Sequence, residues 1–123
     1  MSHCILIHNL DYPSIRPIRA RYCDSFFCRL RGLTFRKQIE ADEGLLLVQA
    51  RDSRLDTSIH MLAVWTELTV VWINANMNVV DKVLARPWHP AYFPHKPAKY
   101  ILEIHPHRWD DFHIGNKVQF EDA

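Results

Sequence analysis

The strongest constraint on the fold is an apolar run in the middle of the chain, from Leu68 to Ile73. Its residues, LTVVWI, are mostly β-branched or aromatic, and such residues fit the pleated surface of a sheet. Both alternating sets of side chains are mostly apolar, which is typical of a strand covered on both faces. Residues 74–78 are rich in Asn, which tolerates the left-handed backbone of tight turns, and residues 79–84 predict a returning strand. The chain is therefore expected to be organised around a central β-hairpin.

Short extended segments, separated by turn signals, flank this hairpin on both sides. We expect strands or extended runs at residues 3–8, 14–22, 44–48, 57–64, 99–105 and 117–121. Pro17 lies inside the second of these, so that segment is expected to be an edge strand or to carry a bulge. Residues 51–56 predict a polar loop, and the proline-rich residues 87–97 predict an extended connection outside the sheet.

One substantial helix is expected, at about residues 24–32. Asp24 or Ser25 could accept a hydrogen bond from an unpaired backbone N–H at its start, and Gly32 suits its C-terminal end. Its apolar residues recur at spacings of three and four: Phe26, Phe27, Leu30 and Leu33. A single helical turn is expected again at residues 108–112. Together these elements predict a mainly β protein, a compact β-barrel or sandwich with one short helix, as a single domain over residues 1–123.

Composition limits the class of protein and of partner. A chain of 123 residues with 48% hydrophobic residues suits one globular domain with one core. Its net charge of +1 creates no overall field that would attract nucleic acid or anionic lipid. The apolar runs are shorter than the roughly 20 residues of a membrane helix, and the first residues lack the pattern of a secretory signal. Three cysteines cannot all pair within one chain, so we expect reduced thiols and a cytoplasmic location.

Four ordered motifs extend over nearly the whole chain. They are Arg31-Gly32-Leu33, Gly44-Leu45-Leu46, the block from His60-Met61 through Leu68 to Ile73, and Leu102-Glu103-Ile104 followed by Gly115. In this order and at these spacings, the chain resembles the small prokaryotic family called domain of unknown function 192, from about Arg19 to Phe120. The resemblance implies one compact β-rich domain with one short helix. It implies no activity, because none is established for the family.

Two positions depart from the pattern of that family. Its members typically have proline, leucine and aspartate at the start of the central strand, where this chain has Glu67-Leu68-Thr69. They typically have glycine and aspartate before the last strand, where this chain has Gly115-Asn116. A hydroxyl and a neutral amide are poor replacements for carboxylate ligands, although Glu67 would share a face with Thr69. We therefore predict that magnesium, calcium, manganese and zinc bind weakly or not at all.

Three polar residues stand at positions that match the family motifs: Arg31, His60 and Glu103. They could form a buried cluster that fixes the helix against the sheet, with Arg31 close to Glu103, or they could form the floor of a pocket. The sequence favours the structural role. A pocket near His60 and Glu103 is the basis of the alternative function, a hydrolase-like or ligand-binding enzyme.

Other reactive residues give weaker signals. His105 and His107 have a spacing that suits a metal, but Pro106 ends the strand between them and no further ligand lies close in sequence. Cys23 and Cys28 lack the spacing of a zinc or redox motif, so Cys28 is expected to pack as a small hydrophobic residue. Cys28, His60 and Glu103 could be drawn as a nucleophile, base and acid, but no glycine elbow surrounds any of them.

Basic and aromatic residues suggest binding surfaces. The N-terminal third contains a run of basic residues interrupted by a single acid: Arg16, Arg19, Arg21, Arg29, Arg31, Arg36 and Lys37. A solvated edge strand accounts for them, and the absence of a ribonucleoprotein-type aromatic motif disfavours nucleic acid as partner. Trp72 is predicted to lie in the core. Trp88, Tyr92 and Phe93 are the candidate surface aromatics for a ligand groove.

These observations favour a small cytoplasmic binding or accessory module without catalysis. We expect no catalytic residue, no cofactor and no metal site. The partner is expected to be a protein or a small molecule, not nucleic acid or a membrane.

Overall fold

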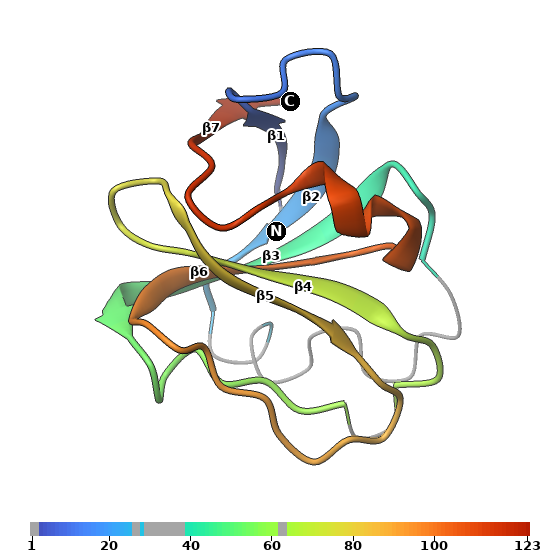
Figure 1. The fold of residues 1–123 in the computed structure, drawn as a ribbon, viewed down its shortest axis with the longest axis vertical. Helices are drawn as coiled ribbons and strands as arrows, with labels where there is room; N and C mark the ends of the chain where they lie inside the picture. The colour runs from blue at the N-terminus through green and yellow to red at the C-terminus, as the bar shows by residue number, and fades with distance from the viewer. Residues whose placement is uncertain (1–2, 26–27, 29–38, 62–63) are drawn as a thin grey trace.

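In a computed structural model, which describes residues 3–25, 28, 39–61 and 64–123, most of the chain forms one sheet of seven strands (Figure 1). The strands are β1 (His3–Asn9), β2 (Ile18–Cys23), β3 (Glu43–Ser53), β4 (Leu68–Ile73), β5 (Val79–Ala85), β6 (Ala98–Ile104) and β7 (Val118–Asp122). A 3-10 helix, η1 (Pro106–Asp111), precedes the last strand. The predicted mainly β class is confirmed.

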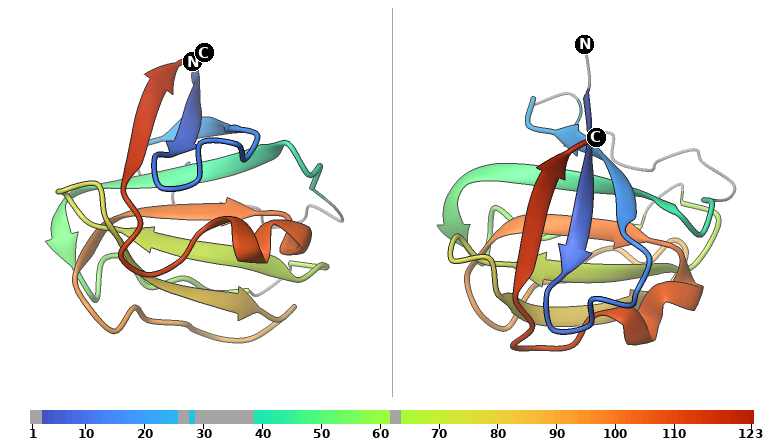
Figure 2. Two further views of the ribbon diagram at one scale, coloured as in Figure 1. Left: turned by 45° about the horizontal axis from the view of Figure 1, so that its top comes forward. Right: turned by 90° about the horizontal axis from the view of Figure 1, so that it is seen from above.

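The strand order across the sheet is β5-β4-β6-β3-β2-β1-β7, so the two ends of the chain meet at one edge. Every pair of neighbours is antiparallel except β2 and β3, which are parallel. The sheet curls so far that its two edges touch: Asn78, before β5, bridges Lys117, before β7, and the N–H of Val79 donates to the carbonyl of Asn116 at 2.9 Å. Figure 2 shows β1 and β7 running across the direction of β3 and β6. The result is a partly closed barrel.

The central hairpin is present as predicted, in strands β4 and β5. All of Leu68–Ile73 is buried, and the strand lies between β5 and β6. In the turn, the left-handed residue is Met77, with φ of 67°. The side chain of Asn74 instead accepts hydrogen bonds from the N–H groups of Asn76 and Asn78, both at 3.0 Å. Asn stabilises this turn mainly as a side-chain acceptor, as is common for Asx turns.

The central strands are covered on both faces. Inside the barrel, one cluster contains Ile18, Leu46, Leu102, Ile104 and Phe112 among others. Outside it, a second cluster contains Leu45, Trp72 and Ile101 beneath the segment that carries Ile59 and Met61. Trp72 is only 1% exposed and its indole N–H donates to the carbonyl of Thr57 at 2.7 Å. The prediction that Trp72 is a core residue is confirmed.

Three element predictions are wrong. β2 lies between β1 and β3, so it is not an edge strand, and Pro17 stands just before its first residue. β3 extends to Ser53, so the loop predicted at residues 51–56 is confined to residues 54–56, and the register shifts after Val48. Residues 57–64 form no strand in their described part; only Ile59 makes an isolated bridge, with Tyr92.

The connection from β2 to β3 begins with a disulfide. Cys23 and Cys28 are bonded, with their Cα atoms 5.6 Å apart, so the prediction of reduced thiols is wrong for this pair. The prediction that Cys28 packs against the core is confirmed, because it lies against the outer apolar cluster. The turn after β2 brings these two residues into disulfide range, which their sequence spacing alone does not reveal. The hydroxyl of Ser25 accepts a hydrogen bond from the N–H of Cys28 at 3.1 Å, as expected of a helix cap. Most of the helix predicted at about residues 24–32, including Arg31, lies outside the described residues.

Arg108 in η1 fixes one end of the barrel. Its buried guanidinium pairs with Asp111 and donates to the carbonyls of Arg16 and, at 2.8 Å, Ala41. It therefore ties η1 to the segments before β2 and β3. The helical turn predicted at residues 108–112 is present as this 3-10 helix, which begins two residues earlier, at Pro106. No helix in the described ranges is long and apolar enough to cross a membrane.

Candidate functional site

Glu103 is the most unusual polar residue of the core. It lies on β6 opposite Leu45 and Val70, so its side chain faces the outer apolar cluster. It is 5% exposed, and burial raises the pKa of its carboxyl from 4.5 to about 7. Its Oε1 atom has no hydrogen-bond partner among the residues that the structure describes. Glu103 is therefore a carboxyl group that readily holds a proton near neutral pH.

His60 lies in a different environment from Glu103. It is exposed, in the irregular segment between β3 and β4. Neither of the two cavities described below is lined by His60 or by Glu103. The structure gives no position for Arg31, so its predicted contact with Glu103 remains a prediction.

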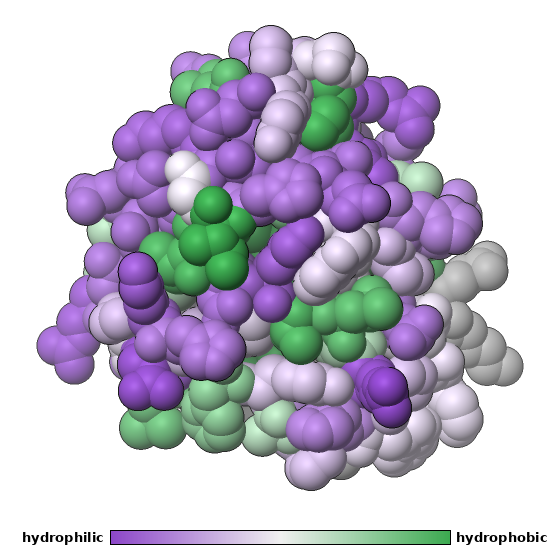
Figure 3. All heavy atoms as spheres, in the orientation of Figure 1, coloured by the Kyte–Doolittle hydropathy of each residue, from purple (hydrophilic) through white to green (hydrophobic). Residues whose placement is uncertain are grey.

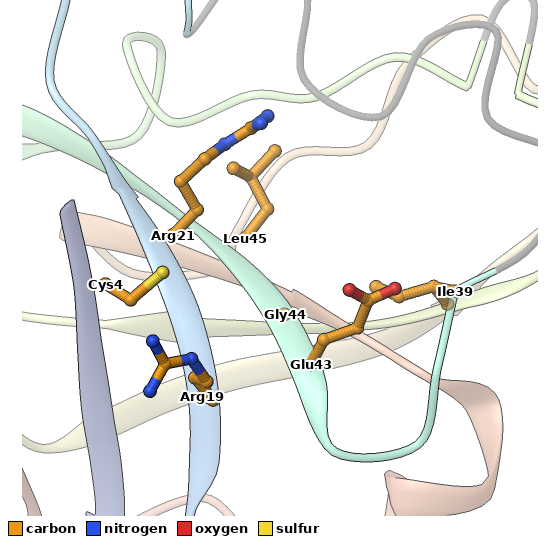
Figure 4. A pocket seen from close by; sticks show the side chains of 7 residues that line it. All are labelled: Cys4, Arg19, Arg21, Ile39, Glu43, Gly44 and Leu45. Atoms are coloured by element: carbon orange, nitrogen blue, oxygen red, sulfur yellow. The ribbon is translucent and has the colours of Figure 1, made fainter. Parts of the chain in front are cut away.

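A cavity of about 200 Å³ opens on the outer face of β1, β2 and β3 (Figure 4). It is lined by Cys4, Arg19, Arg21, Ile39, Glu43, Gly44 and Leu45. Arg19 and Arg21 alternate on β2, and this spacing puts both side chains on one face of a strand. The register then places Cys4, the free cysteine, opposite Arg21, and places Glu43 and Leu45 beside the arginines on the parallel strand β3. We call this site the arginine cavity.

The arginine cavity carries a net positive charge. Nearby Arg16 is neutralised by Asp42, but neither Arg19 nor Arg21 forms an ion pair within the described part of the chain. The carboxylate of Glu43 accepts a hydrogen bond from the N–H of Glu40 at 2.9 Å. Two guanidinium groups against one carboxylate leave an excess of one positive charge, together with free donors that suit a carboxylate or phosphate.

Gly44 explains why β3 passes so close to its neighbours at this point. A Cβ atom on Gly44 would lie 2.9 Å from Cγ2 of Ile104, 3.0 Å from Cγ2 of Ile18 and 3.1 Å from the carbonyl oxygen of Glu103. A larger residue would therefore push β3 away from β6 and from the interior of the barrel. Gly44 therefore allows the close packing of β3 against β6, and β3 forms one wall of the arginine cavity.

A second cavity, of about 190 Å³, lies beside β1 and β7. Its lining includes His8, Gln119 and Glu121, and the loop residues Pro13 and Ile15. The Nε2 atom of His8 lies 3.0 Å from Oε1 of Glu121. We call this site the histidine cavity. Sequence reasoning identified neither cavity.

The predicted surface aromatics are partly as expected. Trp88 and Phe93 are exposed, and Trp88 packs edge-to-face on Trp65 with ring centres 5.3 Å apart. Tyr92 is half-buried, and its hydroxyl accepts a hydrogen bond from the N–H of Arg86 at 3.0 Å. None of these residues lines the two described cavities. On the face shown in Figure 3, hydrophobic side chains form separate patches among hydrophilic ones.

The two positions that lack family carboxylates have structural contacts. Thr69 is fully buried, and its hydroxyl lies 3.4 Å from the carbonyl of Pro106. Asn116 accepts hydrogen bonds at 2.8 Å from the side chain of Asn9 and from the N–H of His113. Within the described ranges, no three His, Cys, Asp or Glu side chains gather as a metal site would require. Weak metal binding remains a prediction.

Sequence reasoning also missed a carboxylate–histidine pair at the β5 edge. Asp81 is buried, and its Oδ2 atom accepts hydrogen bonds from the N–H of His95 at 2.8 Å and from its Nδ1 at 2.6 Å. The imidazole itself is exposed. Asp81 thereby anchors the proline-rich connection to β5. The available signal was an acidic residue inside a predicted strand, where Asp81 and Lys82 interrupt the apolar residues of β5.

The fold and its cavities define a small, mainly β domain with one curled sheet and an arginine-lined cavity on its outer face. The model of the domain of unknown function 192 family (DUF192), described as "Uncharacterized ACR", matches residues 9–120, and the chain belongs to this family. The family assignment made from the four motifs is confirmed.

Relatives of the chain are uncharacterised. It is 37% identical to a UPF0127 protein of Pyrococcus furiosus, over 70% of this chain and 71% of that protein. It is 35% identical to a UPF0127 protein of Thermococcus sibiricus, over 84% of this chain and 66% of that one.

Two solved structures share the fold. A protein of Sinorhizobium meliloti, described as a candidate transcription regulator, superposes with a TM-score of 0.83 at 14% identity, covering 98% of this chain and 94% of that one. A protein of unknown function from Novosphingobium aromaticivorans superposes with a TM-score of 0.79 at 15% identity, covering 96% of this chain and 84% of that one. At these identities the likeness concerns the fold alone.

Proposed function

We propose that this protein is a non-catalytic binding domain that takes an anionic group in the arginine cavity. The observation that carries the proposal is the pair of guanidinium groups, Arg19 and Arg21, on one face of β2 without an ion-pair partner among the described residues. Alternate residues of a strand lie about 6.6 Å apart, so two such groups can both donate hydrogen bonds to one carboxylate or phosphate that lies between them. Leu45 and Ile39 add an apolar wall for the rest of the ligand.

The size and charge of the cavity support a small ligand or a single side chain. A volume of about 200 Å³ is below that of a typical drug-sized pocket. An excess of one positive charge is also far from the many phosphate contacts of a nucleic-acid surface. The proposal thus keeps a protein or small molecule as partner.

Thermal unfolding with simple anions tests this proposal. Inorganic phosphate, succinate and chloride at equal ionic strength serve as probes, since chloride controls for screening. A probe at one hundred times its dissociation constant adds about 2.7 kcal/mol to the native state, which raises the midpoint by several degrees in a domain of this size. We expect this rise for phosphate or succinate.

Arginine variants locate the binding site. Arg19→Gln and Arg21→Gln should each reduce the rise, and the double variant should abolish it. Arg51→Gln is the matched control, because Arg51 is exposed on β3 and does not line the cavity. An equal rise in the double variant and in the control would show that the arginine cavity is not the binding site.

One observation supports a second function, acid–base chemistry at Glu103. A carboxyl with pKa of about 7 is suited to take and return a proton at neutral pH. The exposed position of His60 and the absence of Glu103 from both described cavities weigh against it. Glu103→Gln distinguishes the two functions, because it should leave anion binding unchanged if the arginine cavity is the site.

A cytoplasmic location remains a proposal, and the disulfide gives its test. Disulfides are rare in the cytoplasm of most organisms because thiol reductants keep cysteines reduced. Trapping thiols with an alkylating reagent in intact cells would show whether Cys23 and Cys28 are bonded there. A fully oxidised pair would argue against an ordinary reducing cytoplasm.

A further inference from the structure

We propose that the open end of the β4–β5 hairpin carries a second ligand site, which binds an uncharged sugar on two exposed tryptophans. The site consists of Trp65, Glu67, Leu84, Arg86 and Trp88, and we call it the tryptophan face. None of these residues lines the arginine cavity. The inference therefore does not depend on the proposed anion binding.

The register of the hairpin places Glu67 beside Arg86. Leu68, the first residue of β4, pairs with Ala85, the last residue of β5. Glu67 and Arg86 are the next residues outward, and both are exposed, whereas Leu68 and Ala85 are buried. Successive residues of an extended chain point to opposite sides, so the exposed pair lies on the face opposite to Leu68 and Ala85. A carboxylate and a guanidinium therefore stand near each other at the surface.

The two tryptophans lie two residues farther out on the same segments. Trp65 is 55% exposed and Trp88 is 50% exposed. Their rings meet edge to face, with 87° between the ring planes and 5.3 Å between the ring centres. In this arrangement one indole keeps part of its face open beside the edge of the other. A flat ligand can therefore lie on one ring and touch the second.

The backbone holds Trp88 in this exposed position. Its φ is 64°, in the left-handed region that bulky residues rarely adopt. Its N–H donates to the carbonyl of Met61 at 2.7 Å, and the N–H of Met61 donates to the carbonyl of His89 at 2.9 Å. Backbone conformations of this kind persist where the surrounding contacts impose them, and they cluster at functional sites. The ring is thus presented in a fixed position before any ligand binds.

The charges of the tryptophan face favour an uncharged, polar ligand. Neither Glu67 nor Arg86 forms an ion pair within the described part of the chain. The carboxylate accepts hydrogen bonds and the guanidinium donates them, which suits two adjacent hydroxyl groups of a sugar. A simple cation would be repelled by Arg86 and a simple anion by Glu67, so the pair favours neither.

A pyranose ring also matches the tryptophans. One face of such a ring consists of C–H bonds with a small positive charge, and the face of an indole is negative. The hydroxyl groups extend from the rim of the sugar, where the carboxylate and the guanidinium can reach them. Leu84 is 39% exposed, two residues before Arg86, and extends the apolar surface. The tryptophan face thus combines apolar area with a few polar groups, as ligand sites do.

Titration of the indole N–H signals in NMR spectra tests the inference. The probes are uncharged tetrasaccharides: cellotetraose, maltotetraose, mannotetraose and chitotetraose. At least one of them should give saturable shifts of the Trp65 and Trp88 signals at millimolar concentration. Buried Trp72, whose N–H donates to Thr57, is the internal control and should not shift.

Variants locate the binding site. Trp88→Gly removes one ring and relieves the left-handed backbone, because glycine adopts this conformation without strain. It should lose at least tenfold in sugar affinity, while an unchanged Trp72 signal shows that the variant is folded. Glu67→Ala and Arg86→Ala should each weaken binding severalfold. Phe93→Ala is the matched control and should bind normally, since Phe93 is 52% exposed and has no ring contact with either tryptophan.

Four results would overturn the inference. If no probe shifts the Trp65 and Trp88 signals, the tryptophan face is not a sugar site. If sugar affinity survives in Trp88→Gly, the sugar binds elsewhere. If choline shifts the two signals and no saccharide does, the ligand is a cation. If the wild type sediments as a dimer and Trp88→Gly as a monomer, the face binds a second copy of the chain.

Discussion

Replacing Glu103 by glutamine should stabilise the protein at alkaline pH. The carboxyl of Glu103 has a pKa of about 7 in the folded protein, against an ordinary value of 4.5, because burial penalises its charged form. Between these two values the folded state holds a proton that the unfolded state releases. The contribution of protonated Glu103 to the free energy of unfolding is therefore fully present below pH 4.5. It falls as the pH rises and is lost above about pH 7.

The size of the effect follows from the same two pKa values. Each pH unit between them corresponds to 1.36 kcal/mol, so ionised Glu103 costs roughly 3 kcal/mol at pH 8. Glutamine has nearly the same shape and never ionises. The free energy of unfolding of Glu103→Gln should therefore be about 3 kcal/mol higher than that of wild type at pH 8. The difference should be much smaller at pH 5.

Urea unfolding of both proteins at pH 5 and pH 8 measures this difference. Comparing the two pH values cancels any packing change that glutamine causes, because that change is the same at each pH. Glu67→Gln serves as the control, since Glu67 is exposed and its removal should have the same small effect at both pH values.

The opposite result would refute the reasoning. If Glu103→Gln loses stability at pH 8 relative to pH 5, the carboxylate must be charged and paired with a cation in the folded protein. Arg31, which the sequence predicts to lie beside Glu103, would then be the first candidate partner. In that case Arg31→Met should lower stability by a similar amount.

The other predictions concern the core, the disulfide and metals. Trp72→Ala should cost roughly 3–5 kcal/mol in urea unfolding, because it leaves a cavity in a buried cluster, and a wild-type midpoint would contradict this. Gly44→Ala should cost about 1–3 kcal/mol, since its Cβ would clash with Ile104 and Ile18; a circular-dichroism melt at the wild-type temperature would show that the strand adapts. Reduction of Cys23–Cys28 should remove about 2 kcal/mol, the value for so short a loop, and a melt unchanged by dithiothreitol would show that the bond adds nothing. Magnesium, calcium, manganese and zinc should not shift the melting midpoint; a saturable rise that a chelator abolishes would restore the metal-site reading.

The parts of the fold that depend on local pattern could be predicted from the sequence. The apolar run from Leu68 to Ile73 predicted both the hairpin and its burial on two faces, because composition and alternation are properties of the segment itself. The neighbours of each strand were not predictable in this way. Pro17 suggested an edge strand, but β2 pairs on both sides because the proline stands outside the ladder.

The candidate site depended on information that a single sequence does not carry. The alternation of Arg19 and Arg21 shows that they share a face, but not which strands lie beside them. Only the antiparallel pairing with β1 and the parallel pairing with β3 bring Cys4 and Glu43 to the same place. Glu103 was identified by its motif, and its burial could be predicted from the apolar residues around it.

The pairing of β1 with β7 has a consequence for folding kinetics. Asn9 and Asn116 share a hydrogen bond although 107 residues separate them, so this contact closes one of the longest loops in the chain. Such distant contacts carry a high entropic cost before they form, and they tend to form late. During synthesis, β1 therefore has no partner strand on one of its edges until β7 has been made. Because Gln119 and Glu121 of β7 line the histidine cavity beside β1, this cavity is absent from a nascent chain until β7 has paired with β1.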